Sequence, residues 1–191
     1  YEWFYPSRTD CMRCHTEAAN FVLGPRTPQL NSEYTYPGSG VRDNQLSTLK
    51  HIDFFQEDVP ATNTLSAMVD FNDEKESLLD RTRSYLAGNC AMCHQPAGGT
   101  PTDIDLRWHV SLAETNMVNE SPMRFDFGIE DARIIAPGDP ERSVLPRRMQ
   151  HDGLFRMPPL ATSRLDEDAI QLIRNWAQSL EMPQPEGWKV Y

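Results

Sequence analysis

The chain has 191 residues and a formal net charge of −10 at pH 7, a length that suits one or two domains. This acidic balance argues against nucleic acid as a partner and favours a basic docking patch on another protein, while no apolar run is long enough to predict a membrane span. Only 39% of the residues are hydrophobic and 15 are proline, which indicates short helices and long irregular loops.

The first predicted element is a short helix that carries the run Cys11-Met12-Arg13-Cys14-His15. Ser7 or Thr9 is expected to cap its start, because a side-chain oxygen at that place accepts a hydrogen bond from a free backbone N–H. Residues 16–23 are expected to continue the helix until a Gly-Pro pair stops it. Residues 24–42 are rich in Pro, Gly, Asn and Tyr, and they predict a loop.

A second helix is expected to begin after Asp43 or Asn44. Its apolar stripe has helical spacing and comprises Leu46, Leu49, Ile52 and Phe55. Residues 56–76 predict another loop, which ends in an acidic stretch. We therefore predict a boundary here, between a first unit of residues 1–73 and a second unit of residues 74–191.

The second half predicts a helix at residues 77–86 that leads into Cys90-Ala91-Met92-Cys93-His94. Residues 99–145 are expected to be irregular, and residues 142–149 to form a short helix. Asp166 is expected to cap a final helix. The apolar face of that helix comprises Ala169, Ile170, Ile173, Trp176, Ala177 and Leu180.

The pattern Cys-x-x-Cys-His occurs twice and uses all four cysteines of the chain. It is the attachment signature of a c-type haem, in which two thiols form thioethers with the haem and the histidine becomes an axial ligand of the iron. Cysteines three residues apart on a helical turn share one face, so both reach one edge of the macrocycle. We therefore predict two covalently attached haem c groups, held by Cys11, Cys14 and His15 and by Cys90, Cys93 and His94.

Three other chemistries use paired cysteines. A structural zinc site usually places its two pairs closer together than residues 14 and 90. A thioredoxin-like redox pair belongs in a βαβ unit and needs only one copy. Two disulfides suit a secreted chain. None of the three explains why a histidine follows each pair directly, and haem c does.

The order of elements in the second half resembles a class I cytochrome c domain. The shared features are a helix, Cys-x-x-Cys-His, a long connection, the loop Arg156-Met157-Pro158-Pro159-Leu160 and an aromatic-bearing final helix. The resemblance implies that the first and last helices cross and that Met157 is the sixth iron ligand of the second haem. Less favoured methionines for this role are Met117, Met123 and Met149.

Nearly the whole chain also resembles the diheme c-type cytochrome modules of bacterial secreted and periplasmic proteins. The matching stretches are Tyr5–Cys11, Asn44–Ile52, Tyr85–Cys90, Ala136–Pro140 and Met157–Thr162. The resemblance implies a mainly α, cytochrome c-like fold with two haem-binding units. It also implies a periplasmic or extracellular location in a bacterium, with the signal peptide already removed, since haem c is attached outside the cytoplasm.

The sixth ligand of the first haem has two candidates. His51 follows His15 by 36 residues and lies in one of the matching stretches, whereas Met68 follows it by 53 residues, closer to the usual cytochrome c spacing. We favour His51 and keep Met68 as the alternative; an open or distant position is the third option. The haem propionates have candidate partners in Arg107, Arg124 and Arg133.

Two six-coordinate irons leave no site for substrate, so the predicted function is electron transfer rather than enzymatic catalysis. We expect an extracytoplasmic diheme cytochrome that passes single electrons between a redox donor and an acceptor, as a separate protein or as part of a larger assembly. One alternative is a diheme peroxidase-like enzyme with one open haem. The other is a structural subunit that self-assembles into a cytochrome wire or filament.

Overall fold

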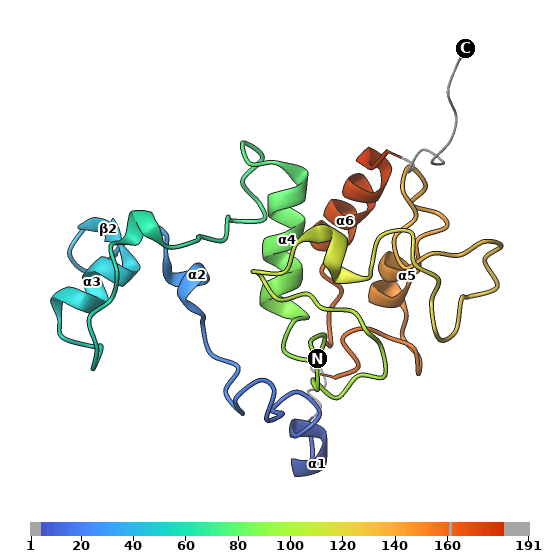
Figure 1. Ribbon diagram of the computed structural model, residues 1–191, viewed down its shortest axis with the longest axis horizontal. Coiled ribbons are helices and arrows are strands. Elements are labelled where there is room, and N and C mark those ends of the chain that lie inside the picture. The colour runs from blue at the N-terminus through green and yellow to red at the C-terminus, as the bar shows by residue number, and fades with distance from the viewer. Residues whose placement is uncertain (1–4, 161, 182–191) are drawn as a thin grey trace.

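The computed structural model describes residues 5–160 and 162–181, and in this part the protein is mainly α with one two-stranded sheet (Figure 1). The α-helices are α1 (Arg8–Cys11), α2 (Thr27–Leu30), α3 (Gln45–His51), α4 (Leu78–Asn89), α5 (Val144–Gln150) and α6 (Glu167–Ser179). The strands are β1 (Glu33–Thr35) and β2 (Arg42–Asn44), and two 3₁₀ helices are η1 (Thr62–Thr64) and η2 (Leu112–Thr115).

Helix α1 begins where the sequence predicts and ends earlier. Ser7 Oγ accepts a hydrogen bond from Asp10 N at 3.2 Å, and the Asp10 carboxylate accepts one from Ser7 N at 3.1 Å, which forms a capping box. The predicted continuation through residues 16–23 is wrong. Asn20 and Phe21 adopt φ values of 54° and 57°, a left-handed conformation that a right-handed helix excludes.

The predicted loop at residues 24–42 is also wrong in part, because it contains α2 and the sheet. Pro28 lies in the first turn of α2, where its missing N–H has no helical partner to lose. Strands β1 and β2 pair antiparallel, with Glu33 opposite Asn44, and Gly40 with φ +71° lies in the connection between them. Both strands are short and largely exposed, so they lack the alternating apolar pattern that reveals a strand.

Helix α3 confirms the predicted helix after Asn44, whose side chain accepts hydrogen bonds from Leu46 N and Ser47 N. The helix ends at His51, so the predicted stripe does not continue to Ile52, which is 62% exposed. Buried side chains are few in this half. In the described residues 5–73 they are Ala19, Asn31 and Leu46.

The main core lies in the second half, where α4 packs against α6 (Figure 1). Both helices have the predicted start: Ser77 Oγ accepts from Asp80 N at 3.0 Å, and Asp166 Oδ1 accepts from Ala169 N at 3.1 Å. The predicted apolar face of α6 is buried. The core cluster comprises Leu86, Ala91, Leu106, Met117, Ile135, Ile173, Trp176 and Ala177.

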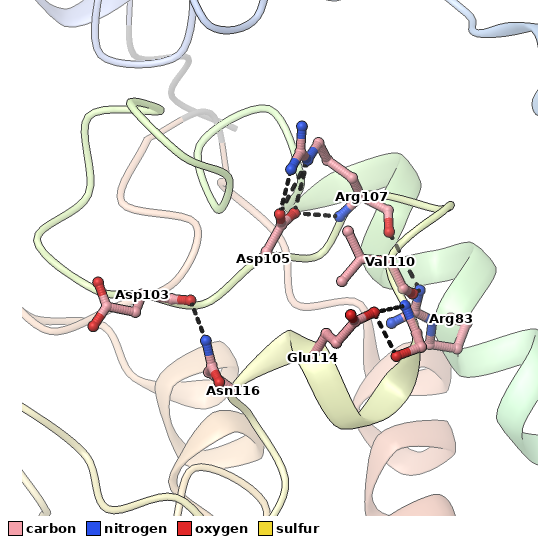
Figure 2. Close-up of polar contacts among 8 residues, drawn as sticks. Arg83, Asp103, Asp105, Arg107, Val110, Glu114 and Asn116 are labelled. Atoms are coloured by element: carbon pink, nitrogen blue, oxygen red, sulfur yellow. Dashed lines mark hydrogen bonds and ion pairs between the residues drawn. The ribbon is translucent and has the colours of Figure 1, made fainter.

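Polar contacts hold the irregular connection between residues 95 and 143 (Figure 2). The buried Arg83 of α4 donates from Nη2 to the carbonyl oxygens of Arg107, Trp108 and Val110. The short helix α5 confirms the helix predicted at residues 142–149, and it packs against α6.

Within the residues that the structure describes, no helix has both the length and the apolarity needed to cross a membrane.

Candidate functional site

A cavity of about 570 Å³ lies beside the second Cys-x-x-Cys-His motif. This volume is within the range of small-molecule and cofactor pockets, about 300–1,000 Å³. Cys93 and His94 line it from the turn after α4, and Met157 lines it from the loop before α6. Its apolar lining comprises Ile104, Pro122, Met123, Ile134, Val144, Leu145, Leu154, Phe155 and Pro159. The structure thus brings two predicted iron ligands, His94 and Met157, to one largely apolar cavity.

His94 is positioned by the turn that ends α4 and by the loop after it. Its N–H donates to Cys90 O at 2.9 Å, and its carbonyl accepts from Leu106 N at 2.9 Å. Its Nδ1 lies 3.5 Å from Thr102 Oγ1. Burial, with a smaller contribution from the Arg148 charge, lowers the pKa of His94 below its usual value. The imidazole is therefore held neutral, which is the form that binds a metal.

The cysteines of the second motif are buried to different degrees. Cys90 caps the C-terminal end of α4 and packs against the core, whereas Cys93 lines the cavity. Burial raises the pKa of both thiols to about 12. Both cysteines are free and protonated at neutral pH, so neither is activated as a nucleophile.

Met157 is fixed at the cavity by its own backbone, since its N–H donates to Arg148 O at 2.9 Å. The less favoured methionines differ in their positions. Met123 also lines the cavity, although it is 67% exposed. Met117 is 1% exposed within the core, and Met149 packs against that core. Only Met123 therefore shares the cavity with Met157 among these alternatives.

Arginines supply the charge of this cavity. Its lining contains Arg13, Arg124, Arg148 and Arg156 and, in the described part of the chain, no acidic side chain. Arg148 is half-buried and donates to Phe155 O at 3.3 Å and Phe125 O at 3.1 Å. Arg156 Nε is buried and has no hydrogen-bond partner among the described residues. An apolar ligand that carries carboxylates, such as haem, fits this lining.

Of the arginines predicted to meet propionates, only Arg124 lines the cavity. Arg107 forms an ion pair with Asp105, in which Nη2 and Oδ2 lie 2.6 Å apart. Arg133 instead donates from Nη1 to Ser121 Oγ at 3.4 Å. Arg148 and Arg156 are residues that the sequence analysis missed. Their positions were the available signal. Arg156 is the first residue of the Met-Pro-Pro loop, and Arg148 lies in the helix predicted before that loop.

The first motif has a well-oriented histidine. His15 Nδ1 lies 2.8 Å from Phe21 O, and because a carbonyl oxygen only accepts, the ring donates there. A neutral His15 then keeps its lone pair on Nε2. An Nδ1–H bond to a backbone carbonyl is the arrangement that commonly orients metal-binding histidines. The left-handed turn at Phe21, which replaces the predicted helix, places this carbonyl.

The two candidates for the first haem's sixth ligand lie elsewhere. His51 is exposed at the end of α3, and α3 lies well apart from α1 (Figure 1). Met68 is half-buried, and its N–H donates to Pro28 O at 2.8 Å in α2. The structure does not bring His51 beside His15, and it ties Met68 to α2.

The four cysteines do not gather as a zinc site. Across residues 5–160 and 162–181, no three His, Cys, Asp or Glu side chains are grouped closely enough to hold a metal ion together. All four cysteines have free thiols, so neither alternative disulfide is present. Comparisons with protein-family models, curated proteins and solved structures find no match to this chain.

Proposed function

We propose that this protein is an extracytoplasmic diheme c-type cytochrome that transfers single electrons between a redox donor and an acceptor. The observation that carries the proposal is the cavity beside the second motif. Cys93, His94 and Met157 line it together, and its other side chains are mainly apolar or arginine. A flat apolar macrocycle with two carboxylates is the class of ligand that such a lining suits.

The residues have separate roles in this proposal. Cys90 and Cys93 attach the second haem, His94 and Met157 ligate its iron, and the arginines meet its propionates. Cys11, Cys14 and His15 hold the first haem. A bound haem supplies a reversible one-electron couple, and the protein tunes that couple through the axial ligands and the surrounding polarity.

The apolar lining has a functional consequence of its own. Ile134, Val144 and Leu145 give the cavity an apolar lining, and around a bound haem such a lining would limit hydration and the reorganisation that accompanies a change of charge. The neutral His94 imidazole keeps its ring nitrogen available at neutral pH. These features suit a carrier that changes charge without binding a substrate.

The first test is to produce the chain in a bacterial periplasm with the haem c attachment machinery and to measure its intact mass. We expect the mass of the chain plus two haems, and a matching haem content per protein by pyridine haemochrome assay. The variant Cys11→Ala/Cys14→Ala is expected to lose one haem, and Cys90→Ala/Cys93→Ala to lose the other. A well-folded chain with no covalent haem would refute the proposal.

The second test separates the carrier from the peroxidase-like enzyme. Electron paramagnetic resonance of the oxidised protein is expected to show a low-spin signal from the second haem, whose iron would be bound by both His94 and Met157, and this signal should not change on adding peroxide or cyanide. Met157→Leu is expected to abolish the sulfur-to-iron charge-transfer absorption and to lower the potential of one haem. The matched variant Met123→Leu changes another methionine of the same cavity and is expected to keep both. A peroxide-sensitive high-spin signal in the unmodified protein would favour the enzyme.

A further inference from the structure

The two Cys-x-x-Cys-His motifs are 75 residues apart in the chain but adjoin in the structure. Met12, Arg13 and Cys14 of the first motif line the same cavity as Cys93 and His94 of the second. The first motif is therefore one wall of the second site. Two independent haem units joined by a linker would not require this arrangement.

A direct contact joins the two motifs, since Cys93 Sγ donates to Arg13 O at 3.5 Å. Cys14, the residue after Arg13, lines the same cavity as Cys93. Both sulfurs are predicted haem attachment points, and a thioether sulfur is bonded directly to the haem edge.

The backbone beside this contact permits the close approach. Gly99, with φ +86°, lies against the first motif, and a Cβ built on it would be 3.6 Å from Thr16 Cγ2 and 3.9 Å from Arg13 O. A larger residue at this position would be strained by the positive φ and would extend toward the first motif. The positive φ, rather than lack of space, favours glycine here, and the segment after His94 lies in van der Waals contact with the first motif and the residue after it.

We propose that Cys14 and Cys93 bring the two haem attachment points together, so that the two haems, when bound, would lie close enough to exchange an electron directly. The proposal rests on the proposed two-haem function. In the step, one ferrous iron becomes ferric and one ferric iron becomes ferrous, and no atom is transferred. The external redox donor supplies the electron at one haem, and the acceptor removes it at the other.

The experiment uses the intact protein, after its mass has shown two attached haems. Electron paramagnetic resonance is recorded on the fully oxidised sample and on a sample poised so that one iron is reduced. We expect the signals of the fully oxidised sample to be broadened by the neighbouring spin and to sharpen once that neighbour is reduced. Circular dichroism in the Soret region is expected to show a couplet of opposite signs.

Single-haem variants provide the matched comparison. The couplet is expected to vanish both in Cys11→Ala/Cys14→Ala and in Cys90→Ala/Cys93→Ala, with the remaining haem shifted in potential. If the intact protein instead gives the sum of two unbroadened low-spin signals and no couplet, the inference is overturned. These spectra are recorded on the intact protein, so the result does not depend on whether a variant folds. A chain with no covalent haem overturns the proposed function as well, whereas two haems with additive signals overturn only this inference.

Discussion

Arg83 is the residue whose replacement tests how the loop after His94 is held. Arg83 is buried, and its Nη2 donates to the carbonyl oxygens of Arg107, Trp108 and Val110. Figure 2 shows Arg83 beside Arg107 and Val110. We expect Arg83→Met, which keeps most of the aliphatic stem, to leave those carbonyls without a donor. The same loop supplies Leu106 N, which binds the His94 carbonyl at 2.9 Å.

The magnitude follows from the number of bonds that one nitrogen can make. Nη2 carries two hydrogens, so two of the three contacts are complete at any time, and a hydrogen bond to a charged group contributes about 1.5–3 kcal/mol. The gross loss is about 3–6 kcal/mol. Methionine avoids the cost of burying the guanidinium, a cost visible in the lowered pKa of Arg83 and in Nη1, which is buried and unpaired among the described residues. We therefore expect a net loss of about 2–4 kcal/mol.

Urea unfolding of the purified protein, followed by far-ultraviolet circular dichroism, measures this loss. The matched control is Arg147→Met, which removes an exposed arginine that pairs with Glu141 at 2.6 Å. An exposed ion pair of this kind is worth about 0–1 kcal/mol. Ordinary surface changes alter the free energy of unfolding by about 0.5 kcal/mol. If the free energies of unfolding of Arg83→Met and the control differ by no more than this, Arg83 does not hold the loop.

Two further changes test the packing of the core and the dependence of the free energy of unfolding on acid pH. Trp176→Ala removes a side chain that is 1% exposed in α6 and is expected to destabilise the protein by about 3–5 kcal/mol in the same assay; Ile52→Ala, at a side chain that is 62% exposed after α3, should change it by less than about 0.5 kcal/mol. Asp105 has a pKa below its usual value, chiefly because Arg107 donates a hydrogen bond to it. Its folded pKa therefore lies below the unfolded value of about 3.9, so its stabilisation is present above that value and is lost as the pH falls through the folded pKa. Asp105→Asn should be less stable than the unmodified protein at pH 7, and the difference should shrink as the pH falls below about 3.9; a difference that does not change with pH would contradict this.

The sequence predicted the larger helices well because their signals are local. Asp166 caps α6 as expected, α4 begins within one residue of its predicted start, and the face of α6 that carries Ile173 and Trp176 is buried. Local signals failed where backbone conformation depends on tertiary contacts. Nothing in residues 16–23 reveals the left-handed turn that brings Phe21 O to His15.

The sequence pointed to two residues that line the candidate cavity but not to most of the residues around them. The motif and the Met-Pro-Pro loop pointed to His94 and Met157, and the structure brings both to one cavity. The arginines were harder to choose, because an arginine that binds an anion and one that pairs with a nearby acid look alike in sequence. Arg107 is of the second kind, and Arg148 reaches the cavity only because α5 packs against α6.

The uneven distribution of buried side chains implies an order of assembly. The second half has a core of its own, built by α4 and α6, whereas residues 5–73 bury only Ala19, Asn31 and Leu46 in the described structure. A unit with so little buried surface gains little from folding alone, and under the proposed function a bound haem would add apolar contacts to it. We therefore expect the second half to fold first and the first motif to pack against it afterwards. Hydrogen exchange on the chain without haem should show protection in α4 and α6 and almost none in α1 or α3.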